Sequence, residues 1–311
     1  MVNALKMVGL LVVLLFAWSG LGAQSNAGLI VNNESAIRSD LLFERFGSRD
    51  NLPDNRIRSI FQDSQGVLWI GTMNGVCQYD GYNFKKDISS RNAFRQSGSW
   101  TSDICEDSLS NIWMGTKDGL NVYNTISQEF THYASNISNQ GTIIDNEIKA
   151  LLYDQNSNLW IGTAKGLMQY DPIKRKFIVF SNFPLNTTIT KIIRSYDDYI
   201  WIACSTGVVH YHTKTGKFDF YQKEVKADAY GDRIWSVLEV GKNLLIGTGG
   251  EGLLQLSYNS KTNEYSQFEP VISTFQNSES LAETEIFDIC RSKTGDIWVG
   301  TNRGLGRIQH L

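Results

Sequence analysis

One short motif returns six times along this chain, and it limits the possible folds more than any other feature. The first copy is Val67-Leu68-Trp69-Ile70-Gly71-Thr72, and a glycine follows within a few residues. The equivalent central residues are Trp69, Trp113, Trp160, Trp201, Leu245 and Trp298, spaced 41 to 53 residues apart. A sequence period in this range is typical of repeat proteins, in which each repeat is one supersecondary unit.

Each repeat predicts one small antiparallel sheet. In the first repeat, four short segments bounded by glycine-containing turns read as strands, at residues 57–63, 67–72, 76–80 and 83–86. Four short strands per repeat make one blade of a β-propeller. We therefore expect an all-β fold, a β-propeller of about six four-stranded antiparallel blades.

The two ends of the repeat region leave two arrangements open. The sixth repeat stops after its third strand, at residues 304–311, and residues 41–46 read as a lone strand before the first repeat. The lone strand could complete the last blade of a six-bladed ring and remove its open edge. Alternatively, the six repeats form an incomplete seven-bladed ring. Either way, we assign the propeller to residues 41–311 and a polar leader to residues 24–40.

The N-terminus reads as a secretory signal peptide covering residues 1–23. Lys6 supplies a positive charge, residues 7–18 form a short apolar run, and Gly22 and Ala23 offer cleavage sites. An uncleaved membrane anchor is the alternative, although the run is short for a membrane span. We expect the mature chain to be exported to the periplasm.

Composition and motifs argue against several classes of function. The net charge of −3 gives no basic face for nucleic acid. The four cysteines lie in different repeats, so they predict neither a metal site nor a disulfide framework. His210 and His212 share one strand face, where surface histidines are a simpler interpretation than a metal site. No phosphate-binding glycine loop occurs, so we predict no cofactor and no metal.

Some recurring residues read as framework. Tryptophan on the second strand can fill the gap between blades, and glycine two residues later leaves room where blades crowd together. Asp63, Asp107 and Asp154 recur at one repeat position and are predicted to form turns rather than to act in catalysis.

The candidate ligand site lies where the repeats differ. Counting back from each central residue gives a ring of strand-opening residues that mixes Arg and Lys with Trp and Phe. Aromatic faces stack on sugar rings, and arginine donates forked hydrogen bonds to hydroxyls or carboxylates. We predict that this ring binds a carbohydrate, with an acidic one well suited. The predicted ligand-binding residues are Arg56, Arg58, Trp100, Glu147, Lys149, Arg233 and Trp235.

The first repeat also resembles a known family. Residues 55–57 and 61–72, with Gly75, Tyr79-Asp80-Gly81 and Phe84, are similar to the two-component regulator propeller repeat. The resemblance covers about residues 41–311. It implies the periplasmic sensor region of a hybrid two-component histidine kinase, which binds oligosaccharides and controls genes for polysaccharide use.

Full-length members of that family continue into a second propeller, a membrane helix and a kinase, and none of these is recognisable in the sequence. We therefore read the chain as an N-terminal fragment of such a protein, with a truncated gene product or a free-standing propeller as the alternatives. By itself it is expected to be non-enzymatic, with membrane attachment only through a missing C-terminal region. The resemblance also implies a possible homodimer. The alternative function is an exported propeller enzyme, a polysaccharide lyase or glycosidase, for which Glu147 and Glu285 are the acids in the predicted ring.

Overall fold

A computed structural model of the chain describes residues 45–85, 100–136, 142–180, 183, 187–196, 198–223, 233–271 and 285–308. The predicted signal peptide, the predicted leader and residues 41–44 of the predicted lone strand lie outside these ranges. The described chain forms two compact units. Unit 1 holds residues 46–205 and 210–218, and unit 2 holds residues 206–209 and 219–308.

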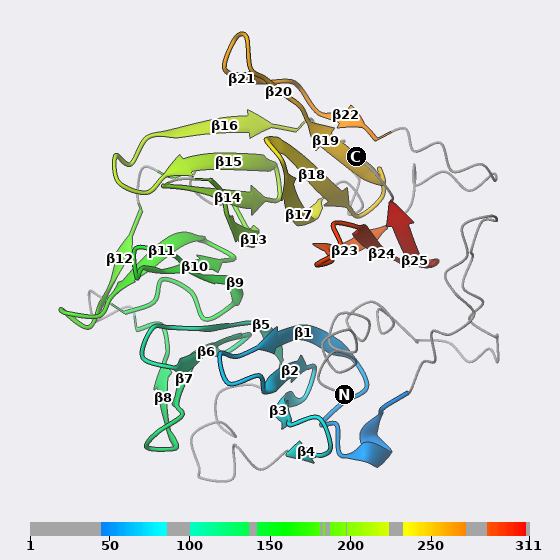
Figure 1. The fold of residues 1–311 in the computed structure, drawn as a ribbon. Coiled ribbons are helices and arrows are strands. Elements are labelled where there is room, and N and C mark those ends of the chain that lie inside the picture. Colours follow the sequence, from blue (N-terminus) through cyan, green and yellow to red (C-terminus); the bar gives the residue numbers. More distant parts are fainter. Residues whose placement is uncertain are drawn as a thin grey trace. The chain divides into compact units, whose positions relative to one another are not determined.

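The first four repeats each form an antiparallel sheet whose strands follow chain order (Figure 1). We number the sheets as blades 1 to 4, and the fourth contributes residues to both units. Their strands are β1 (Ile57–Gln62), β2 (Leu68–Thr72), β3 (Gly75–Tyr79) and β4 (Phe84–Lys85); β5 (Thr101–Glu106), β6 (Asn111–Thr116), β7 (Gly119–Asn124) and β8 (Glu129–Tyr133); β9 (Ile148–Tyr153), β10 (Leu159–Thr163), β11 (Gly166–Asp171) and β12 (Lys176–Val179); and β13 (Ile189–Arg194), β14 (Tyr199–Cys204), β15 (Gly207–His212) and β16 (Phe218–Gln222).

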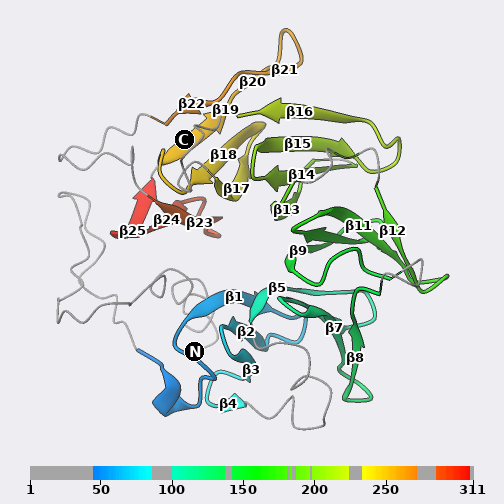
Figure 2. The ribbon, with the colours of Figure 1, turned by 180° about the vertical axis from the view of Figure 1, so that it is seen from behind.

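The last two repeats form blades 5 and 6 in unit 2 (Figure 2). Their strands are β17 (Ile234–Val240), β18 (Asn243–Thr248), β19 (Leu253–Leu256) and β22 (Glu269–Pro270), followed by β23 (Ile286–Arg291), β24 (Ile297–Thr301) and β25 (Gly304–Ile308). The predicted all-β propeller of six antiparallel blades is therefore confirmed. In the described residues the one helical element is a 3-10 turn, η2 (Ser48–Asp50). No helix within these ranges is long and apolar enough to cross a membrane.

Blade 5 differs from its predicted plan. A two-stranded ribbon, β20 (Tyr258–Asn259) and β21 (Glu264–Tyr265), lies between its third and fourth strands. The fourth strand then begins at Glu269. The repeat pattern could not predict the ribbon, because the ribbon lies between two copies of the motif, where chain length varies.

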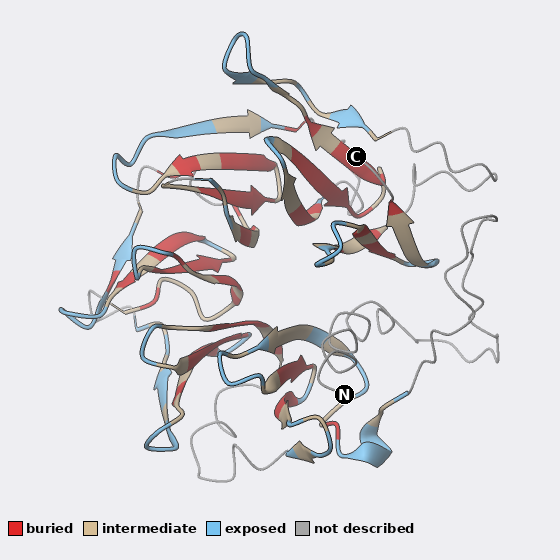
Figure 3. Ribbon diagram, viewed as in Figure 1, coloured by how far each residue is buried: buried red, intermediate tan, exposed pale blue. Residues whose placement is uncertain are grey.

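The framework roles predicted for tryptophan and glycine are confirmed. Trp69 is fully buried, and its ring lies 5.6 Å from that of Tyr123 in blade 2. Trp113 likewise reaches Tyr170 of blade 3 at 5.1 Å. Figure 3 shows burial concentrated in the inner and middle strands, with exposed turns and outer strands. Burying each large apolar side chain contributes about 1.5–3 kcal/mol, which explains why neighbouring blades must stack.

The glycine two residues after the central residue lets blades 1, 2, 3 and 5 approach the next blade, whereas Ala203 stands there in blade 4. A β-carbon on Gly115 of blade 2 would lie 2.6 Å from Cγ2 of Ile148 in blade 3, closer than real contacts allow. Within unit 1 the first strands β1, β5, β9 and β13 contact one another in this order, and in unit 2 β17 contacts β23. The first strands are therefore the inner strands of each unit.

Blade 6 is three-stranded in the described residues, with β25 at its edge. Gly119 and Gly304 open the third strands of blades 2 and 6 with the same φ of 135°. A β-carbon on Gly119 would overlap the carbonyl oxygen of Tyr133 in the fourth strand, whereas one on Gly304 meets nothing within 4 Å. Trp298 of blade 6 is correspondingly half-exposed.

The predicted completion of blade 6 by residues 41–46 stays a prediction, because residues 41–44 lie outside the described ranges. Arg45 and Phe46 are not in a strand. The Phe46 ring packs in blade 1, 5.8 Å from Tyr79 and 5.2 Å from Phe84. The described end of the predicted strand therefore belongs to the core of the first blade.

Candidate functional site

The residues that open the inner strands occupy one equivalent position in all six blades. In each blade, the N–H of the residue that follows the second strand donates a hydrogen bond to the opening residue's carbonyl. The N–O distances are 3.0–3.2 Å, and the acceptors are Arg56, Trp100, Glu147, Thr188, Arg233 and Glu285. The turn after the second strand therefore borders each strand opening. Arg233 also occupies this position.

The residue two places after each opening residue lies in a break of the strand pairing. Pairing between β1 and β2, for example, shifts register between Ile57 and Ser59 and so skips Arg58. The skipped residues are Arg58, Ser102, Lys149, Thr190, Trp235 and Phe287. A β-bulge frees its extra residue from the ladder and re-aims its side chain, and bulges are common beside functional sites. Six equivalent bulges thus present six different side chains.

In unit 1 the structure brings Arg58 and Trp100 together. The guanidinium carbon of Arg58 lies 5.0 Å from the centroid of the Trp100 ring, a cation–π contact between blades 1 and 2. Arg56 instead turns to Asp54, to which it donates two side-chain hydrogen bonds of 3.0 Å. These bonds hold the pKa of Asp54 below its usual value.

Blade 3 contributes a pair of opposite charges. Lys149 Nζ forms an ion pair with Oε1 of Glu147, two residues earlier. Both side chains are partly exposed, so the pair is worth about 0–1 kcal/mol to stability. The pairing leaves these two predicted site residues without net charge between them.

Sequence counting missed a second ion pair on the inner strands. The Asp103 carboxylate, on β5, accepts a hydrogen bond of 3.0 Å from the Leu151 N–H on β9. The same carboxylate lies 3.8 Å from Nζ of Lys191 on β13. The sequence did contain a signal for this pair. Asp103 and Lys191 directly follow the bulge residues of blades 2 and 4, and the same position holds the small residues Ser59 and Ala150 in blades 1 and 3.

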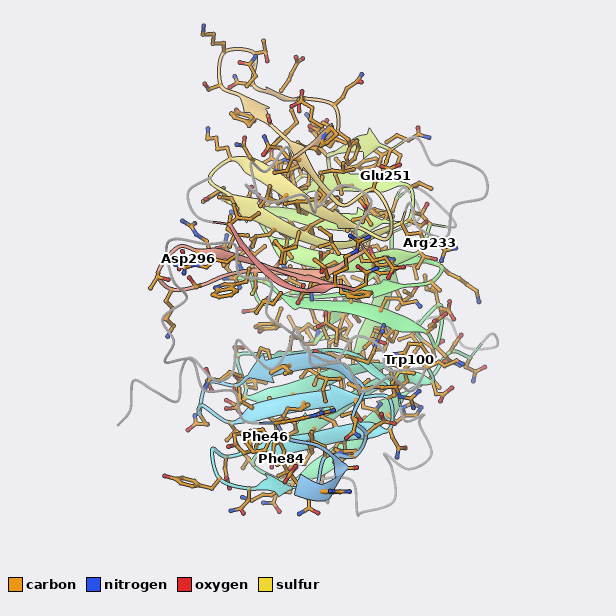
Figure 4. The ribbon with its side chains drawn as sticks, turned by 90° about the vertical axis from the view of Figure 1, so that its right-hand side faces the viewer. Phe46, Phe84, Trp100, Arg233, Glu251 and Asp296 are labelled. Carbon is orange, nitrogen blue, oxygen red and sulfur yellow. The ribbon has the colours of Figure 1, made fainter. Side chains whose placement is uncertain are left out.

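In unit 2 the bulge residues form an aromatic pair. The rings of Trp235 and Phe287 stack with centroids 5.2 Å apart and planes 11° from parallel. Arg233 opens the same strand and lies on the same side of the unit as Glu251, with Asp296 on the opposite side (Figure 4). Glu251 binds the buried Lys223 ammonium at 2.9 Å, a pair that sequence reasoning also missed. The varied side chains of unit 2 thus gather at the strand openings.

The opposite, closing ends of the inner strands repeat one arrangement, as predicted for Asp63, Asp107 and Asp154. Each carboxylate accepts hydrogen bonds from backbone N–H groups of the following turn. Each also accepts one from the tryptophan indole of its own blade, at 2.7–2.8 Å. These aspartates hold turn and tryptophan together, which confirms their structural role.

Blade 4 replaces this arrangement, and His210 is a partly exposed side chain that packs against aromatic rings rather than a simple surface histidine. Ser195 stands at the aspartate position, and the His210 ring stacks on Trp201 and Tyr199 with centroids 4.1 and 4.3 Å away. Burial, with a smaller contribution from His212, lowers the pKa of His210 to about 4. The sequence placed both histidines on one strand face but could not show that the aromatic neighbours face the same way.

Three of the four cysteines, Cys77, Cys105 and Cys204, are buried. Burial raises the pKa of Cys204 to about 12 and that of Cys290 to about 11, which disfavours reactive thiolates at neutral pH. Within the described ranges, no three His, Cys, Asp or Glu side chains are grouped to hold a metal ion.

Comparison with known proteins identifies the repeats. The sequence profile of the two-component regulator propeller matches residues 51–74, 142–165 and 280–303. These segments cover the closing turn and second strand of blades 1, 3 and 6. No curated protein sequence matches the chain.

Solved structures share the fold. The extracellular domain of the one-component system BT4673 from B. thetaiotaomicron aligns with a TM-score of 0.65 and 21% identity, covering 83% of this chain and 33% of that one. The extracellular domain of the hybrid two-component system BT3049 from the same organism aligns with a TM-score of 0.60 and 20% identity, covering 86% and 42%. The chain therefore spans less than half the length of these proteins.

A third similar structure is PorZ, a surface component of the type-IX secretion system of Porphyromonas gingivalis. It aligns with a TM-score of 0.57 and 18% identity, covering 79% of this chain and 39% of that one. The profile thus matches three segments of this chain, and the structures show that its fold is also found in extracellular domains of two-component systems.

Proposed function

We propose that this chain is an exported ligand-sensing propeller that binds oligosaccharides at the openings of its inner strands. The observation that carries the proposal is the bulge repeated in every blade, because it aims a different side chain from each blade at one equivalent position. The closing ends of blades 1 to 3, in contrast, repeat the same hydrogen bonds between an aspartate, a turn and a tryptophan. A varied set on a constant frame is the expected design of a binding surface.

The side chains at the openings suit sugars. Trp235 and Phe287 form a flat apolar pair, and a sugar ring can stack on an aromatic face. The guanidinium of Arg58 and the charges of Glu147 and Lys149 offer donors and acceptors to hydroxyl groups. Within unit 1, the Trp100 ring beside Arg58 adds aromatic contact area to these polar groups, a combination that ligand sites use.

The similarity to extracellular domains of two-component systems supports a sensing role outside the cytoplasm. In this proposal the occupied propeller passes its state to a histidine kinase that controls genes for polysaccharide use. The predicted signal peptide supports export to the periplasm.

An exported polysaccharide lyase or glycosidase is the second candidate. Glu147 is the acid in the unit 1 part of the predicted ring, and it is bound to Lys149. This carboxylate is thus engaged by a lysine of the same blade rather than left open to a substrate. The geometry therefore favours binding over turnover.

Calorimetric titration of the purified chain with a panel of plant and host oligosaccharides tests the proposal, with chromatography of the sugars afterwards. We expect saturable binding with no new product, and about tenfold weaker binding in Trp235→Ala. Tyr82→Ala is the matched control, because Tyr82 is an exposed aromatic residue outside the strand openings. New products would support the enzyme, and the absence of binding to every sugar would refute the proposal.

A further inference from the structure

Arg58 differs from the other cations of the predicted site in unit 1. Arg56 is bound to Asp54 and Lys149 to Glu147. Lys191, on the neighbouring inner strand β13, lies near Asp103. Arg58 has no carboxylate or other hydrogen-bond acceptor among the residues that the structure describes. Unlike Arg56, Lys149 and Lys191, Arg58 therefore carries a positive charge that no carboxylate of the described residues neutralises.

Besides its contact with Trp100, Arg58 keeps its hydrogen-bond donors available. The guanidinium lies over the indole ring at 5.0 Å. A guanidinium carries all its N–H donors in its own plane and accepts no hydrogen bonds. Among the described residues no carboxylate or other acceptor engages these N–H donors, so they are available to a partner. The neighbouring turn adds little net charge, since Lys117 and Asp118 oppose each other.

Two further polar groups at the same junction lack partners. The indole nitrogen of Trp100 and the hydroxyl oxygen of Thr101 are buried, and neither has a hydrogen-bond partner in the described structure. The indole N–H can only donate. Arg58 has an exposed surface, yet the protein around it lowers its pKa through desolvation. A positive, donor-rich spot in partly desolvated surroundings favours an anion.

We propose that Arg58, oriented by Trp100, binds the carboxylate of a uronic acid residue, so that the sensed oligosaccharide is acidic. A carboxylate has two acceptor oxygens in a plane, which match the donor fork of arginine. The inference rests on the proposed function and names the sugar class for the same site. Arg58 provides charge and specificity, and Trp100 holds the guanidinium in place.

The test compares acidic oligosaccharides with their own neutral forms. The probes are oligogalacturonate and a glucuronate-containing tetrasaccharide, each with its carboxyl-reduced counterpart, titrated into the full chain by calorimetry. We expect one acidic probe to bind at least tenfold more tightly than its reduced form, with affinity falling as salt is raised. Arg58→Gln should remove that preference, so that the acidic and the reduced probe bind equally.

Arg56→Gln is the matched control, because it changes the same residue type at the same strand opening, where Asp54 already neutralises the charge. We expect it to keep the acidic preference. Arg58→Lys, which keeps the charge but loses the fork, should retain part of it. Melting curves of all three variants establish that each is folded.

Three results overturn the inference. Equal binding of acidic and reduced probes would refute the carboxylate site, while the proposal that the propeller binds oligosaccharides would still hold. An equal loss in Arg56→Gln and Arg58→Gln shows a general charge effect rather than a specific site. If no saccharide of either kind binds, the proposed function itself fails together with the inference.

Discussion

The two ends of the inner strands differ in what they repeat. At the closing ends of blades 1 to 3, Asp63, Asp107 and Asp154 make the same hydrogen bonds to a turn and to a tryptophan indole. At the opening ends the backbone repeats, with the same bulge in every blade, but the side chains change from blade to blade. Blades 1 to 3 thus combine a constant structural end with a variable end.

This difference teaches where substitutions should change stability and where they should change binding. A closing end buries hydrogen-bonded groups, whose loss leaves unsatisfied donors. An opening end holds partly exposed side chains, whose pairs stabilise the fold only weakly.

The largest effect is expected at the closing end of blade 3. Asp154→Ala removes the acceptor of the Trp160 indole, at 2.7 Å, and of two backbone N–H groups in the turn. We expect a loss of about 2–4 kcal/mol in the free energy of unfolding, measured by chemical denaturation. Ser195→Ala, at the same position in blade 4, is the control and should cost much less. An Asp154→Ala loss below that of Ser195→Ala would contradict the structural role.

The free energy of unfolding is expected to depend on pH because of His210, at the closing end of blade 4. His210 has a pKa of about 4 in the folded chain against 6.5 when unperturbed, so the unfolded state binds more protons between these values. Stability should therefore fall by about 2–3 kcal/mol as the pH drops from 6.5 to 4. Denaturation at several pH values measures the slope, and His210→Phe, which keeps an aromatic ring beside Trp201, should reduce it. An unchanged slope in His210→Phe would place the proton uptake elsewhere.

A smaller effect on stability, with a clear effect on binding, is expected at the opening end of unit 2. Trp235→Ala removes one ring of the stacked pair with Phe287. Such an aromatic pair is worth about 0.5–1.5 kcal/mol beyond its buried area. We expect oligosaccharide affinity to fall about tenfold while the melting transition stays cooperative. A collapse of the fold in this variant would show that the opening end is structural.

The smallest effect is expected for the exposed ion pairs at the unit 1 openings. Arg56→Ala breaks the pair with Asp54, and Lys149→Ala breaks the pair with Glu147. Each should change the free energy of unfolding by less than about 1 kcal/mol, and salt should reduce the difference between each variant and the wild type. Losses above 2 kcal/mol by denaturation would mean that these pairs belong to the frame.

Much of the fold could be predicted from the sequence because the frame repeats. The spacing of Trp69 and its counterparts predicted the number and order of the blades. The glycine that follows most of these residues predicted the close packing of neighbouring blades. The ribbon at residues 258–265 could not be predicted, since it interrupts one blade without any repeated signal. The stacking of His210 depends on which faces meet across two strands, which alternation alone does not specify.

The candidate site was predictable in position but not in its pairings. Counting from the tryptophans identified both the opening residues and the bulge residues. It could not show that Arg56 is bound to Asp54 while Arg58 lies over Trp100, because side-chain direction at a bulge depends on local geometry. Asp103 and Lys191 were missed because their contact joins strands two blades apart.

Hydrogen exchange of the backbone with and without an acidic oligosaccharide tests the division between the two ends most directly. The account predicts slower exchange on binding at strand openings, in peptides covering residues 56–58, 100–102 or 233–235. It predicts no change in the closing turns at residues 63–67, 107–111 and 154–158. Protection confined to those closing turns would contradict it.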